Sequence, residues 1–149
     1  MMKQTLLACI TVVVLFFSAC TDRNVHYQYA ALDQNLSLED ENIEALSRAF
    51  LEYWDAVSRH DFNLSYRYEL PYIRFLKPFE EYKAESNVLL KHFHVTMKSY
   101  ECEDNGCRVV EVTREFRVGK KRRLFRSKWI RLDGKWYHKY DFSLFPTAY

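Results

Sequence analysis

Two polar side chains fall on strands whose alternating pattern would point them at an apolar interior. Arg114 lies two residues after Val112, and His138 shares a face with Trp136 and Tyr140. Successive side chains of a strand point to opposite faces, so we expect both to face inward. A cation in an apolar cavity needs a counter-charge.

Two interpretations of Arg114 follow. It binds an anionic ligand, with Tyr53 and His138 shaping the pocket, or it pairs internally with Glu52 or Asp55 of the first helix. A β-bulge would shift the face and remove Arg114 from the interior.

No motif of nucleophilic or metal-dependent catalysis occurs in the sequence. The chain lacks H-E-x-x-H and G-x-S-x-G, and three glycines cannot make a phosphate-cradling glycine-rich loop. His92 and His94 share a strand face and would suit a metal, but no third ligand accompanies them. We expect no catalytic residue, no metal and no cofactor, and a binding domain in preference to an enzyme.

Residues 1–19 have the composition of a cleavable signal peptide. Lys3 supplies a positive charge, and the run from Leu6 to Ala19 is uncharged and apolar or small. This run makes roughly 21 Å of helix, short of the ~30 Å hydrocarbon core. A cleavable signal therefore fits better than a permanent membrane span.

Phe17-Ser18-Ala19-Cys20 resembles the bacterial lipobox, although leucine is usual where Phe17 stands. The resemblance implies cleavage before Cys20 and acylation of its thiol, which anchors the chain in a membrane. The alternative is an ordinary signal peptide with a cysteine in it. In enterobacterial lipoproteins an aspartate directly after the cysteine retains the protein in the inner membrane, whereas here Thr21 stands in that place and Asp22 follows it. Resemblance to that rule favours the outer membrane, with the protein in the cell envelope facing the periplasm. Residues 20–36 lack periodicity, so we expect a lipid-anchored tether there.

Cys102 and Cys107 then remain as a pair in an oxidising compartment. The Asn105-Gly106 step between them is typical of a hairpin turn, which brings the two cysteines within disulfide reach. Two cysteines alone are too few ligands for a metal site. The spacing therefore predicts a disulfide.

Charge is strongly segregated along the chain. Residues 31–62 carry eight acids and two bases, whereas residues 108–131 carry ten bases and two acids. Gly119–Arg123 indicates a basic hairpin tip, which is a solvated loop or a contact for anionic lipid headgroups, lipopolysaccharide phosphates or an acidic protein surface. The acidic first helix of a second copy would also be complementary. We expect no nucleic acid partner, because the predicted location is outside the cytoplasm.

Residues 37–149 have the pattern of one α+β domain. Helical spacing predicts a helix from about Ser37 to Arg59, a second over 62–69 that stops before Pro71, and a third from about Lys77. Beyond Ser86 the apolar period changes to two. This change predicts an antiparallel meander around Val95, Val112, Trp129 and Trp136.

This layout, with the segment Ala49-Phe50-Leu51-Glu52-Tyr53-Trp54-Asp55 and the closing residues 128–137, resembles the nuclear transport factor 2-like cone fold over about residues 40–145. The resemblance implies a curved antiparallel sheet around helices and a cone-shaped cavity. Tyr53 matches the tyrosine of ketosteroid-isomerase relatives, but their paired aspartates are not reproduced. Since this fold hosts many functions, we expect an envelope lipoprotein that binds a partner or itself, with an anionic-ligand or enzymatic cavity at Arg114 as the alternative.

Overall fold

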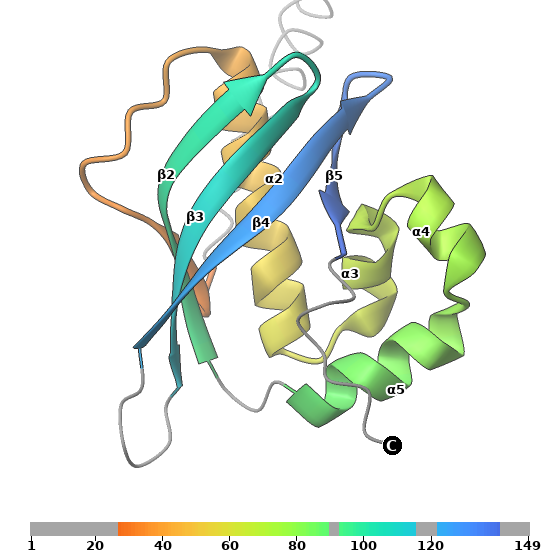
Figure 1. The fold of residues 1–149 in the computed structure, drawn as a ribbon. Helices are drawn as coiled ribbons and strands as arrows, with labels where there is room; N and C mark the ends of the chain where they lie inside the picture. The colour runs from red at the N-terminus through yellow and green to blue at the C-terminus, as the bar shows by residue number, and fades with distance from the viewer. Residues whose placement is uncertain (1–26, 90–92, 116–121, 141–149) are drawn as a thin grey trace, which may run out of the picture.

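The computed structural model describes residues 27–89, 93–115 and 122–140. Within these residues, four helices and a curled five-stranded sheet make an α+β fold. The helices are α2 (Glu41–Ser58), α3 (Phe62–Tyr68), α4 (Pro71–Leu76) and α5 (Phe79–Leu89). The strands are β1 (Ala30–Leu32), β2 (Phe93–Glu103), β3 (Gly106–Glu115), β4 (Arg122–Leu132) and β5 (Lys135–Lys139). In Figure 1, α2 crosses behind the long strands and α3–α5 gather at one side.

Helix α2 buries one apolar face against the sheet. Its N-cap is Asp40, whose carboxylate accepts hydrogen bonds from the backbone N–H groups of Asn42 and Ile43. The helix therefore begins later than the start at about Ser37 that the sequence predicted. The buried apolar positions recur at helical spacing and include Leu46, Phe50, Tyr53 and Val57.

The sheet is mixed, whereas the sequence predicted an antiparallel one. Strands β2 to β5 form the expected meander, but β1 pairs with β2 in parallel. β1 lies inside the segment predicted to be a tether. Tertiary contacts hold it there, because the Asp55 carboxylate accepts hydrogen bonds from the backbone N–H groups of Gln28 and Tyr29, each at 3.0 Å. The folded body therefore begins before residue 37.

The inward face of β3 is the opposite of the one we expected. On β2, Val95 and Met97 are buried as predicted, but β3 buries Val109 and Glu111. Its pairing with β4 has no bulge, so position 114 falls on the other face from Glu111, opposite His94 and Arg122. Valines on both faces of β3 made the alternation ambiguous. The Arg114 side chain lies outside the described structure, so its proposed ligand contact stays a prediction.

Pro71 begins a helix that the sequence did not predict. It occupies the first turn of α4, where its missing N–H costs nothing. The hairpin of β2 and β3 carries a disulfide between Cys102 and Cys107, the pair that the spacing predicted. In the described part of the chain, no helix has the length and apolar character needed to cross a membrane.

Candidate functional site

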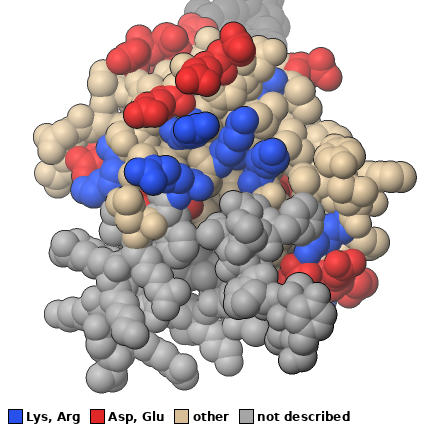
Figure 2. All heavy atoms as spheres, in the orientation of Figure 1, with Lys and Arg blue, Asp and Glu red and all other residues tan. Residues whose placement is uncertain are grey.

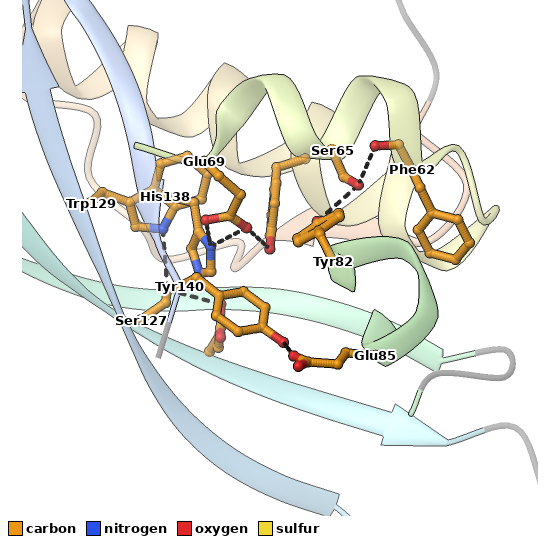
Figure 3. Close-up of polar contacts among 11 residues, drawn as sticks. Phe62, Ser65, Glu69, Tyr82, Glu85, Ser127, Trp129, His138 and Tyr140 are labelled. Carbon is orange, nitrogen blue, oxygen red and sulfur yellow. Dashed lines mark hydrogen bonds and ion pairs between the residues drawn. The ribbon is translucent and has the colours of Figure 1, made fainter. Parts of the chain in front are cut away.

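A buried polar cluster lies where α2, α3 and β5 meet (Figure 3). Its centre is Glu69, the residue after α3, whose side chain is 0% exposed. The Tyr53 hydroxyl donates to Glu69 Oε1 at 2.8 Å, and His138 Nδ1 lies 3.1 Å from the same oxygen. The Tyr53 ring also stacks on the His138 imidazole, with centroids 4.4 Å apart. Burial beside this carboxylate raises the pKa of Tyr53 well above its ordinary value.

A second buried acid, Glu111, lies on the inward face of β3. The Ser127 hydroxyl donates to Glu111 Oε2 at 3.2 Å and accepts from Trp129 Nε1 at 3.1 Å. Burial raises the pKa of Glu111 to about 7, against the opposing effects of His138 and of hydrogen bonds from Ser127 and Trp54. A large share of the Glu111 carboxyl groups is therefore protonated near neutral pH.

The cluster continues away from the sheet through tyrosines. Tyr82 donates to the Ser65 hydroxyl at 3.0 Å, and Tyr140 donates to Glu85 Oε2 at 3.0 Å. Lys77 forms an ion pair with the same Glu85 carboxylate. These contacts tie α3, α5 and the end of β5 together, so the interior polar groups satisfy one another and support the fold.

The structure brings together two of the three predicted pocket residues. Tyr53 and His138 are in contact, and the polar partner that they share is Glu69, which no sequence pattern indicated. The proposed partners of Arg114 have other contacts: Glu52 accepts a hydrogen bond from Tyr68, and Asp55 pairs with Arg59 at 2.8 Å.

The other predicted residues are only partly described. His92 and Cys20 lie outside the described residues. Where side chains are described, no group of three or more His, Cys, Asp or Glu residues is arranged to hold a metal.

Exposed cations occupy the outer face of the sheet, and we call four of them the basic face: Arg108, Arg126, Lys128 and Lys139. Arg108 pairs with Lys128 across β3 and β4, and Lys128 pairs with Lys139 across β4 and β5. Figure 2 shows Lys and Arg side chains gathered over the strands that cover α2 in Figure 1. Among the described residues, no ion pair engages any of the four.

A groove of about 650 Å³ lies between α2, the helices α3 and α4, and the turn from β4 to β5. Its charged lining residues, which we call the arginine groove, are Arg48, Glu52, Arg67, Arg74 and Lys135. No sequence pattern indicates this groove, because its charged residues are dispersed between positions 48 and 135.

Comparisons with known proteins identify no family. No family model matches the chain, and no curated protein matches it. Among solved structures, the chain is similar to the solution structure of a SEC-C motif containing protein from Rhodopseudomonas palustris. The identity is 16% and the TM-score 0.46, over 73% of this chain and 93% of that one.

These comparisons correct the predicted family. The sequence predicted a lipoprotein with a nuclear transport factor 2-like domain. The similar solved structure is described instead as a SEC-C motif containing protein, and no family model or curated protein supports the prediction. The prediction relied on helices followed by a meander and on aromatic placement, which are features that unrelated α+β domains share. The α+β class remains, with a mixed sheet.

Proposed function

We propose that this chain is an exported envelope protein, anchored by lipid on Cys20, whose folded domain docks through the basic face on an anionic membrane surface. Its role is binding, and no reaction is assigned to the buried cluster. The outer membrane is the favoured location, because Thr21 stands directly after Cys20, where an aspartate would retain an enterobacterial lipoprotein in the inner membrane.

The row of like charges on the sheet carries this proposal. Arg108, Lys128 and Lys139 stand directly opposite one another on three neighbouring strands. Like charges in such positions destabilise a sheet by up to about 1 kcal/mol for each pair. Glu101 of β2 lies opposite Arg108 and is the acidic residue at the end of this row. Lipid phosphates facing the row would offset the repulsion, at about 1 kcal/mol for each basic residue near the surface.

The short separation between Cys20 and the folded domain supports a membrane as the partner. Cys20 precedes Tyr27, the first described residue, by seven positions. A chain of that length spans at most about 25 Å. A lipid on Cys20 would therefore keep the domain beside the headgroups, where even weak electrostatic attraction acts at high local concentration.

Strand pairing puts the start of β1 level with the start of β4. Ala30 of β1 pairs with Val95, which pairs with Thr113, which in turn pairs with Arg123 of β4. The chain therefore enters the sheet at the end where β4 begins with two arginines. Along β3, Arg108 lies five residues from Thr113, about 17 Å.

Substitution of Cys20 by serine tests the anchor. The C20S variant is expected to lose all metabolic labelling by palmitate and to remain an uncleaved precursor, because the thiol is the acyl acceptor. The matched control C9S, in the same segment, should be labelled and cleaved like the wild type. Mass spectrometry of the N-terminus distinguishes these outcomes, and a C20S chain that still carries lipid would contradict the anchor.

Docking itself is tested by chemical labelling of Lys128 on vesicles. The processed chain, inserted through its own lipid, should have Lys128 protected when the vesicles contain anionic lipid and accessible when they do not.

A further inference from the structure

The arginine groove has an excess of positive charge that the described side chains do not neutralise. Arg48, Arg67, Arg74 and Lys135 line it together with a single acid, Glu52. The Glu52 carboxylate already accepts a hydrogen bond from the Tyr68 hydroxyl. In the described part of the chain, none of the four cations forms an ion pair.

Arg74 gives the second observation. Its Nε is buried and finds no hydrogen-bond partner among the described residues. Its backbone is held in place, because the Tyr66 hydroxyl donates to the carbonyl oxygens of Arg74 and Lys77 at 3.0 and 2.8 Å. A ligand in the groove therefore meets Arg74 through its Nη groups, because Arg74 lines the groove and its Nε has no accessible surface.

The geometry of a guanidinium restricts what such a ligand offers. The two Nη atoms present parallel N–H groups, a fork that matches two oxygens of a phosphate or carboxylate. The volume of about 650 Å³ exceeds that of a single inorganic ion and lies in the usual range for small-molecule sites. The groove is also lined by aromatic residues that can contact the uncharged part of a ligand, namely Tyr68, Trp136 and Tyr137.

We infer that the arginine groove binds a small phosphorylated molecule, with its phosphate on Arg74 and its uncharged body against Tyr68 and Tyr137. Arg48, Arg67 and Lys135 supply the remaining charge for a dianion, which favours a phosphate monoester over a single carboxylate. This inference depends neither on the lipid on Cys20 nor on the basic face, because the two surfaces share no cation.

Isothermal titration of the full chain in neutral detergent tests the inference, with glucose 6-phosphate as probe. Saturable binding with a dissociation constant below about 1 mM is expected, and glucose should not bind. Inorganic phosphate should bind at least threefold more weakly, because it lacks the body. Citrate at matched ionic strength serves as the carboxylate arm. Citrate binding more tightly than glucose 6-phosphate would overturn the phosphate assignment.

Variants assign the binding to the groove. R74Q should weaken glucose 6-phosphate binding at least tenfold, since a hydrogen bond to a charged group is lost. R74K keeps the charge without the fork and should also weaken it several-fold. R67Q, at an exposed position, provides a second test if R74Q folds poorly. R126Q makes the same charge change on the basic face and should bind normally. Equal affinity in R74Q, R67Q and R126Q, or no saturable binding in the wild type, would overturn the site.

Discussion

Replacement of Glu69 by alanine is expected to lower the free energy of unfolding by about 3–5 kcal/mol, because two buried groups lose their shared partner, at about 1–3 kcal/mol each, and a cavity is left. Glu69 is fully buried and is the acceptor for both Tyr53 and His138. Its loss leaves a hydroxyl and an imidazole inside the protein without their acceptor. Denaturant unfolding followed by tryptophan fluorescence measures the change.

Two controls separate the buried acid from a general loss of charge. E69Q keeps an acceptor oxygen for Tyr53 and should cost clearly less than E69A. E80A removes an exposed acid from the first turn of α5 and should change stability by no more than about 0.5 kcal/mol. A cost below 1 kcal/mol for E69A would show that the cluster does not hold α3 to the sheet.

Replacement of Glu111 by glutamine is expected to change how stability depends on pH. Burial raises the pKa of Glu111 from 4.5 to about 7, so between these values the folded chain keeps a proton that the unfolded chain releases. Its contribution is therefore fully present below about pH 4.5 and is lost as pH rises through 7. The shift corresponds to about 3 kcal/mol. E111Q, which cannot ionise, should lack this decline and be more stable than the wild type at pH 8.

The comparison is made from unfolding curves at several pH values between 5 and 8. The difference between wild type and variant isolates Glu111 from the other titrating groups. E101Q, an exposed acid on β2, should leave the pH profile unchanged. Parallel profiles for wild type and E111Q would mean that Glu111 is ionised in the folded state.

The sequence predicted the elements whose signal is local. Helix α2 has a long apolar period, and Tyr53 and His138 were placed on inward faces that do meet. Glu69 and Glu111 were missed because a buried acid breaks the apolar pattern that reveals a core. Strand β1 is three residues long and depends on hydrogen bonds to Asp55, a residue more than twenty positions away. Neither the alternation of apolar residues nor strand propensity reveals such a long-range contact.

The basic face and the arginine groove also depend on contacts between residues far apart in the sequence. The basic composition of residues 108–131 was plain, but only strand pairing shows that Arg108, Lys128 and Lys139 form one row. The arginine groove takes Arg48, Arg67 and Arg74 from three different helices. Its charge becomes visible only when the helices are packed.

Acetylation of lysines in the processed, lipid-inserted chain tests membrane docking most directly. Vesicles of phosphatidylcholine alone are compared with vesicles that also contain phosphatidylglycerol. Lys128 and Lys139 should be labelled at least threefold more slowly on the anionic vesicles, and 0.5 M NaCl should restore labelling because salt screens the attraction. Lys83 on α5 serves as the internal control and should be unaffected. Equal labelling of Lys128 on both kinds of vesicle would contradict docking through the basic face.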